Sequence, residues 1–171
     1  MRTFALLALS LAATAFAWFF LPPKPQLRAL EDVLGKRSDN DPRLDSAFND
    51  LTGRTKEAFR AKYKSLPREA LNDRGTIVYL LGKNLAEAAD WQFLMDVAAE
   101  PPCLSLADCS KPAPSASGDD VTLAYPALVA LKAAENVLKE EPANQEAMAI
   151  VLSGKHSKSA AVVNLAASLQ P

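Results

Sequence analysis

Hydrophobic residues recur along most of the chain with the spacing of α-helices. Beyond residue 40, apolar positions return every three or four residues in segments of about 10 to 15 residues, separated by short polar connections. No segment shows the alternation that predicts a half-buried β-strand. Helices of this length are not stable alone in water, because a single helix buries too little apolar surface. The pattern therefore predicts an all-α protein of short helices packed as antiparallel pairs.

Capping residues, prolines and glycines predict where the helices begin and end. Asp41-Pro42 predicts a start, and Leu44, Phe48 and Leu51 predict one face of a helix that ends at Gly53. The same signals predict an earlier helix that carries Leu27, Leu30 and Leu34 and ends at Gly35. They predict six later helices: Thr55 to Pro67, Asn72 or Asp73 past Leu85, Asp90 to Pro101-Pro102, Asp120 or Pro126 past Leu138, Glu141-Pro142 to Gly154, and Ser157 or Ser159 past Leu169.

Two features within these helices bear on packing. Gly75 and Gly82 interrupt a helical pattern, and such glycines are expected to let helices approach closely. In the helix opened by Asp90, the spacing places Trp91 on the buried side and leaves Phe93 off it. An exposed Phe93 would be able to anchor a partner, although packing in the core is the favoured interpretation.

The N-terminal segment is the most apolar part of the chain. Residues 3–21 carry no charge, and as a helix they would span about 28 Å, close to the thickness of bilayer hydrocarbon. As a signal peptide the segment would be cleaved at Ala15-Phe16-Ala17, whereas as an anchor it would continue through the aromatic run Trp18–Phe20. A buried core helix is a third alternative. We expect residues 1–23 to be a signal anchor or signal peptide, with the anchor favoured.

Either of the first two alternatives exports the remainder of the chain. We expect residues 24–40 to form a juxtamembrane helix and linker, and residues 41–171 to form a helical repeat-like domain. The protein would face the periplasm or the extracellular side from a membrane anchor, or be secreted if the N-terminal segment is cleaved.

A segment rich in proline and serine, residues 100–120, interrupts the helical domain. Cys103 and Cys109 lie six positions apart at its base, and an oxidising compartment favours a disulfide that closes this small loop. Free thiols and a chemical role stay open as alternatives, but the spacing is not Cys-x-x-Cys and no further metal ligands are near. The loop also carries Leu104 and Leu106, which we take as possible partner-binding residues together with Trp91 and Phe93.

The segment from Asn72 to Leu85, followed by Ala89 to Leu94, resembles one HEAT-type repeat. Such repeats place a helix ending near Leu-Gly before a short turn, an aspartate and a second helix with a leucine a few residues in; Leu81-Gly82 and Asp90–Leu94 match this pattern. The resemblance implies a right-handed stack of antiparallel helix pairs, an α-solenoid, behind the N-terminal hydrophobic helix. The insertion after Pro101 departs from the regular repeat spacing.

A second resemblance competes with the first. Ala130, Ala134, Val137 and Pro142 fall at the spacing of the second helix and closing proline of a tetratricopeptide repeat, although the helix that follows ends at Gly154, too early for a full unit. Both resemblances imply stacked helices with one continuous core and a concave surface.

Composition excludes more functions than it suggests. With 49% hydrophobic residues the chain is globular, and a formal net charge of −1 argues against binding to nucleic acid. His156, the only histidine, lies in a polar turn and is interpreted as a solvated residue. The basic stretch from Arg54 to Arg68 is interpreted as a solvated helix face, and the pair Asp119-Asp120 as a helix cap.

We therefore predict no catalytic, cofactor-binding or metal-binding residues, no small-molecule substrate, and a protein that is not an enzyme. The expected function is a protein-binding or scaffold module at the cell envelope, joined to the membrane through its N-terminal helix. The alternatives are a secreted inhibitor or effector that presents residues 100–118 as a disulfide-tied loop, and an envelope hydrolase whose carboxylates have no assigned positions.

Overall fold

The computed structural model describes residues 25–36, 40–112 and 119–169. All regular secondary structure in these ranges is helical and none is strand, which confirms the all-α prediction. The expected signal anchor or signal peptide, residues 1–23, lies outside the described residues. Across the described ranges, no helix combines the length and the apolar character that crossing a membrane requires.

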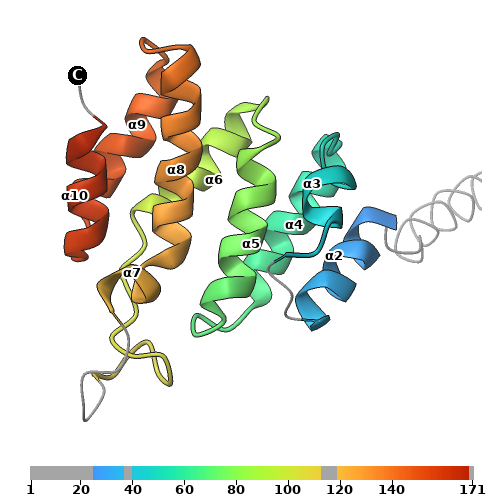
Figure 1. Cartoon of the computed structure of the whole chain (residues 1–171), viewed down its shortest axis with the longest axis horizontal. Coiled ribbons are helices and arrows are strands. Elements are labelled where there is room, and N and C mark those ends of the chain that lie inside the picture. The colour runs from blue at the N-terminus through green and yellow to red at the C-terminus, as the bar shows by residue number, and fades with distance from the viewer. Residues whose placement is uncertain (1–24, 37–39, 113–118, 170–171) are drawn as a thin grey trace, which may run out of the picture.

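The helices follow one another along the long axis of the molecule, from α2 at one end to α10 at the other (Figure 1). Their bounds are α2 Pro25–Lys36, α3 Arg43–Ser46, α4 Gly53–Ser65, α5 Leu71–Gly82, α6 Ala88–Ala98, α7 Asp120–Leu123, α8 Tyr125–Glu140, α9 Gln145–Gly154 and α10 Ala160–Ser168.

Two consecutive helix pairs, α5–α6 and α8–α9, form the centre of the fold. Helix α5 packs along α8, α6 packs along α9, and α6 also contacts α8. Gly75 faces the ring of Tyr125, and a Cβ built on Gly82 would lie 2.8 Å from the Cβ of Ala133. The earlier residue of α5, Gly75, meets the earlier residue of α8, and the later residue, Gly82, meets the later one, so α5 and α8 are parallel. The expectation that these glycines allow close helix approach is confirmed.

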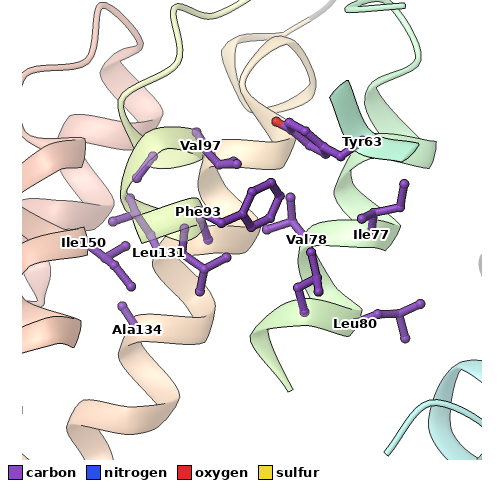
Figure 2. Packing of buried hydrophobic residues seen from close by; sticks show 14 of the residues in the cluster. Tyr63, Ile77, Val78, Leu80, Phe93, Val97, Leu131, Ala134 and Ile150 are labelled. Carbon is purple, nitrogen blue, oxygen red and sulfur yellow. The ribbon is translucent and has the colours of Figure 1, made fainter. Parts of the chain in front are cut away.

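The main hydrophobic core has large, fully buried side chains from α2, α4, α5, α6, α8 and α9. Figure 2 shows its central part, where residues of α4, α5, α6, α8 and α9 pack together. The expected phase of α6, with Phe93 off the buried side, is wrong, but the favoured interpretation that Phe93 packs in the core is confirmed. Phe93 is only 6% exposed and meets the ring of Tyr63 edge-on, with the ring centroids 5.1 Å apart, whereas Trp91 is half-buried. Because α6 contacts α5 on one side and α8 and α9 on the other, its buried face is wider than a single stripe.

The helix expected from Asp41-Pro42 to Gly53 is also wrong. Helix α3 ends at Ser46, and Gly53 begins α4 rather than ending its predecessor. The side chain of Asn84 replaces the missing helical hydrogen bonds: its amide nitrogen donates to the Phe48 carbonyl at 2.8 Å, and its oxygen accepts from the Leu51 amide at 3.0 Å. The predicted stripe of Leu44, Phe48 and Leu51 is nevertheless buried.

Several helix ends differ from expectation and others agree. Helix α5 begins at Leu71 after Ala70, with no side-chain cap from the expected Asn72 or Asp73, and α9 begins after an Asn144 cap rather than at Glu141-Pro142. The caps of α7 and α10 are confirmed, because Asp119 accepts from the Thr122 amide and Ser159 accepts from the Val162 amide.

Candidate partner-binding surfaces

The first candidate surface is a groove on the side of the molecule formed by α3, α5 and α8. Two neighbouring cavities of about 360 and 510 Å³ share Tyr79 and Tyr125 as lining residues and together make up this groove. We call it the tyrosine groove; it is lined by Asn40, Asp41, Pro42, Leu44, Asp45, Thr76, Tyr79, Gly82, Lys83, Tyr125, Val129, Lys132, Ala133, Asn136, Val137 and Glu140.

Both tyrosines are exposed yet fixed in position. Tyr79, 40% exposed, donates its hydroxyl to the Asp45 carboxylate at 3.2 Å, and the Lys83 ammonium lies 5.3 Å from its ring centroid. Tyr125, 39% exposed, rests on the backbone at Gly75, where no Cβ would fit. Partial burial and the Asp45 hydrogen bond raise the pKa of Tyr79, so the hydroxyl stays protonated.

The groove is lined both by small or apolar residues and by polar ones. Gly82, Ala133 and Val137 supply small or apolar surface between the two helices. The Lys83 ammonium donates to the Leu44 carbonyl at 3.2 Å, which leaves further N–H groups on the same nitrogen. A surface with fixed aromatic rings, small lining residues and side-chain hydrogen-bond donors is typical of sites that bind polypeptide segments.

The second candidate surface is the loop after α6. Cys103 and Cys109 form a disulfide, as the sequence predicts. Their side chains are buried against Leu71 and Leu123, in a small apolar cluster separate from the main core. The disulfide therefore fastens the loop to the start of α5 and to α7.

Hydrogen bonds complete the attachment of the loop. The Cys103 amide donates to the Leu123 carbonyl at 3.0 Å, and the Cys109 amide donates to the Glu69 carboxylate at 2.8 Å. That bond lowers the pKa of Glu69, which holds the carboxylate in its charged, accepting form. Residues 100–112 of the segment thus have a defined conformation without regular secondary structure.

The four residues proposed as partner-binding occupy different environments. Leu104 and Leu106 are 52% and 45% exposed on the disulfide-tied loop. Trp91 is half-buried on α6, and Phe93 lies inside the core, where a partner has no access to it. The structure does not bring the four together as one surface.

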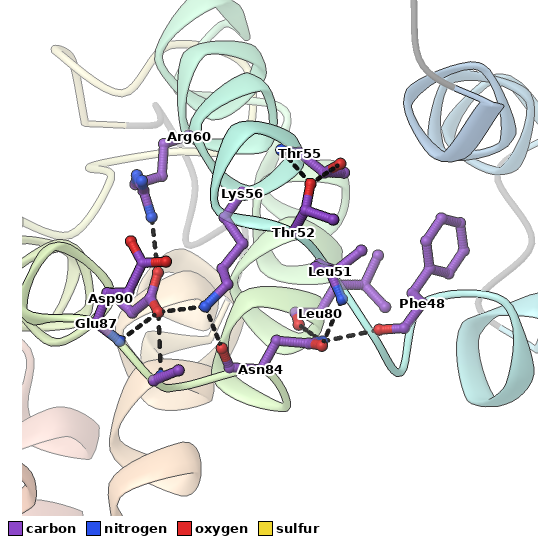
Figure 3. Close-up of polar contacts among 11 residues, drawn as sticks. Phe48, Leu51, Thr52, Thr55, Lys56, Arg60, Leu80, Asn84, Glu87 and Asp90 are labelled. Atoms are coloured by element: carbon purple, nitrogen blue, oxygen red, sulfur yellow. Dashed lines mark hydrogen bonds and ion pairs between the residues drawn. The ribbon is translucent and has the colours of Figure 1, made fainter.

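A buried ionic cluster that the sequence pattern does not reveal joins α4 to α6 (Figure 3). One carboxylate oxygen of Asp90 accepts from the Lys56 ammonium at 2.5 Å, and the other accepts from Arg60 at 2.8 Å. The side chains of Asp90 and Lys56 are 0% and 4% exposed. Lys56 and Arg60 belong to the basic stretch interpreted as solvated, so that interpretation is wrong for Lys56.

The cluster is complete without a ligand. Asp90 also accepts from the Ala86 and Glu87 amides at 3.1 and 3.0 Å, and Lys56 donates to the Asn84 carbonyl at 2.7 Å. Burial acts to raise the pKa of Asp90, but the hydrogen bonds from Lys56 and the two amides outweigh it, and the pKa lies below its ordinary value. These residues therefore stabilise the fold.

A second, partly buried ion pair joins the same region. Arg74 binds the Glu100 carboxylate at 2.5 Å, and its guanidinium lies 3.9 Å from the Tyr63 ring centroid. Burial and the neighbouring Glu100 raise the pKa of Tyr63, whose hydroxyl donates to that carboxylate at 3.0 Å. The contacts tie α4 and α5 to the end of α6, directly before the disulfide-tied loop.

The described residues contain no group of three or more histidine, cysteine, aspartate or glutamate side chains placed to hold a metal ion. His156 is exposed in the turn after α9, as expected. Comparison of the chain with family models, with curated proteins and with solved structures found no match.

Proposed function

We propose that the protein is a helical-repeat module at the cell envelope that binds a protein partner in the tyrosine groove and is not an enzyme. In this proposal the N-terminal hydrophobic segment tethers the domain to the membrane, and the groove faces the periplasm or the extracellular side. The observation that carries the proposal is the pair of fixed, exposed tyrosines, Tyr79 and Tyr125, which line both cavities of the groove.

The packing of the helix pairs supports the repeat assignment. In an α-solenoid, equivalent helices of successive pairs are parallel and pack on one another. Helices α5 and α8 pack in this way, as the contacts of Gly75 with Tyr125 and of Gly82 with Ala133 indicate, and α6 packs on α9. The groove follows the seam between α5 and α8, which is the side on which a solenoid presents one row of equivalent helices.

Site-specific photo-crosslinking tests the proposal. We would place p-benzoylphenylalanine at Lys132, which lines the groove, and at Leu152, an exposed residue of α9 that does not line it. We expect the Lys132 probe to capture one defined protein from the envelope, the Leu152 probe to miss it, and Tyr79→Ala to abolish the capture. Equal capture by both probes, or capture insensitive to Tyr79→Ala, would contradict the proposal.

A second candidate function is that of a secreted inhibitor or effector that presents the disulfide-tied loop. The observation that favours it is the exposure of Leu104 and Leu106 on a loop held by a disulfide and by hydrogen bonds to Glu69 and Leu123. A loop fixed before binding loses little conformational entropy when it enters a partner's pocket.

Replacing Leu104 and Leu106 with aspartate separates the two candidates. Both side chains are exposed, so the fold and the groove should stay intact. If the loop is the binding site, the double variant loses the partner while Tyr79→Ala retains it. If the groove is the binding site, Tyr79→Ala loses the partner while the double variant retains it.

A further inference from the structure

We propose that the tyrosine groove binds a proline-rich segment of its partner, extended as a polyproline II helix and carrying a lysine or arginine. This inference rests on the proposed function, because it specifies the chemistry of the partner that the groove would bind. It follows from the hydrogen-bonding groups of the groove, from its length and from its charge.

The hydrogen-bonding groups favour a segment that offers acceptors and few donors. The main-chain groups of α5 and α8 are largely engaged within their own helices, so the walls present no row of backbone groups to which a β-strand could pair. What the walls offer is the side-chain donors of Lys83, Lys132 and Asn136. A helical ligand has its carbonyls paired internally, whereas a polyproline II segment leaves its carbonyls free and has few N–H groups.

The aromatic rings fit the same ligand. Pro-rich segments dock in grooves lined by aromatic side chains, and their preformed backbone limits the entropy lost on binding. Tyr79 is held by Asp45 and Lys83, and Tyr125 by its contact with Gly75, so both rings are already placed before a ligand arrives.

The dimensions fit a short segment. The lining residues of α8 extend from Tyr125 to Glu140, which corresponds to about 22 Å at the rise of an α-helix. A polyproline II helix advances about 3.1 Å per residue, so the groove would hold roughly seven residues.

The charge of the groove favours a basic residue in the ligand. Asp41 is paired with Arg43 and Lys132 with Glu135, so these charges are balanced within the molecule. The exposed carboxylates of Asp45 and Glu140 then outnumber the positive charge of Lys83. A lysine or arginine between prolines would complement this excess.

Fluorescence anisotropy with two labelled peptides tests the inference on the full chain in detergent. The first probe is Pro-Pro-Lys-Pro-Pro-Lys-Pro-Pro, and the second replaces every proline with alanine and keeps both lysines. We expect saturable binding of the first probe and at least tenfold weaker binding of the second. Equal binding of the two would overturn the proline-rich assignment.

Variants locate the binding site. Tyr79→Ala should weaken binding of the proline probe at least tenfold and Asp45→Lys several-fold, while the matched controls Leu152→Ala and Glu146→Lys on α9 should not change it. Because Asp45 is exposed, its replacement tests the site even if Tyr79→Ala perturbs folding, which circular dichroism would reveal. Binding insensitive to both groove variants would overturn the inference.

The outcomes also separate this inference from the proposed function. Capture of a partner by the Lys132 crosslinker, sensitive to Tyr79→Ala but without discrimination between the two peptides, would retain partner binding and reject the proline-rich ligand. Crosslinking of the Lys132 probe to a second copy of the chain would reject a separate partner as the occupant.

Discussion

Replacing Asp90 with asparagine would remove the negative charge to which two cations of the α4–α6 interface bind. An asparagine side chain has nearly the shape of the aspartate, so the change isolates the charge from the packing. The Lys56 ammonium would stay buried without a counter-charge, because its remaining acceptors, the Asn84 carbonyl 2.7 Å away and the amide oxygen of the new asparagine, are both neutral. Arg60, whose side chain is 17% exposed, would turn toward solvent more easily.

The expected cost follows from this burial. Removing one partner of a buried ion pair costs about 3–5 kcal/mol, because the other charge remains uncompensated. The partial exposure of Arg60 argues for the lower end, about 3 kcal/mol. Since a domain of this kind has a free energy of unfolding of about 5–15 kcal/mol, the loss would be readily measured.

Replacing the other partner of the ion pair, Lys56, should cost less. In Lys56→Met, the Asp90 carboxylate keeps Arg60 and the Ala86 and Glu87 amides as donors, so we expect a loss of about 1–2 kcal/mol. In the double variant the buried ammonium is absent, and the cost of Asp90→Asn should fall accordingly. This non-additivity identifies the ion pair itself as the source of the loss.

Urea unfolding at neutral pH, followed by far-ultraviolet circular dichroism, measures these changes. Asp96→Asn is the matched control, because Asp96 is exposed on the same helix and accepts only from Gln92 among the bonds described; it should cost under about 0.5 kcal/mol. A loss below about 1 kcal/mol for Asp90→Asn, or strict additivity with Lys56→Met, would refute the reasoning.

Four further predictions use the same measurement of unfolding free energy. Replacing Cys103 and Cys109 with serine should cost about 2 kcal/mol, from the chain entropy of a short loop, without lowering helix content; no loss would show that the disulfide does not fasten the loop. Gly75→Ala should cost about 1–3 kcal/mol, because the added methyl group would clash with the ring of Tyr125. The control Gly35→Ala should not show this cost, because Gly35 is exposed and nothing lies within 4 Å of the added methyl group. Asn84→Ala should cost about 1–3 kcal/mol and abolish hydrogen-exchange protection of the Leu51 amide; retained protection would contradict the role of its side chain. Because the folded-state pKa of Asp90 is lowered, its stabilisation is fully present above the ordinary aspartate pKa of about 4 and is lost as pH falls from there through the lower folded-state pKa, so Asp90→Asn should flatten the acid limb of the stability profile.

Local sequence signals identified those helix ends that depend on neighbouring residues. Ser159 caps α10 and Asp119 caps α7 through bonds to amides three residues ahead, a relation that the sequence displays directly. The disulfide was predictable for a similar reason, because two cysteines six residues apart at the base of one loop leave few alternatives.

Long-range polar contacts explain where sequence reasoning failed. The apolar stripe Leu44, Phe48 and Leu51 has helical spacing, but Asn84, more than thirty residues away, supplies bonds that hold this segment in another conformation. In the same way, Lys56 is indistinguishable in sequence from the exposed lysines of its helix until Asp90 is placed beside it. Only the tertiary structure shows these partners.

The tyrosine groove was not predictable as a site for the same reason. Tyr79 and Tyr125 belong to different helix pairs, and the insertion between the pairs hides their relation in the sequence. One signal did point toward it: Gly75 and Gly82 lie seven residues apart on one face of α5, with Tyr79 between them, and the small-residue stripe of α8 is its natural packing partner.

Residues at the C-terminal end of α5 hold both the tyrosine groove and residues 44–51, the segment before α4, in place. Tyr79 bonds Asp45, Lys83 bonds the Leu44 carbonyl, and Asn84 holds Phe48 and Leu51. Loosening this segment by Asn84→Ala would therefore also release the carboxylate that positions Tyr79, and a ligand of the groove should bind less tightly. By thermodynamic reciprocity, a ligand that requires Tyr79 and Asp45 in place must stabilise the segment in return, so the proline probe should offset part of the loss in unfolding free energy that Asn84→Ala causes.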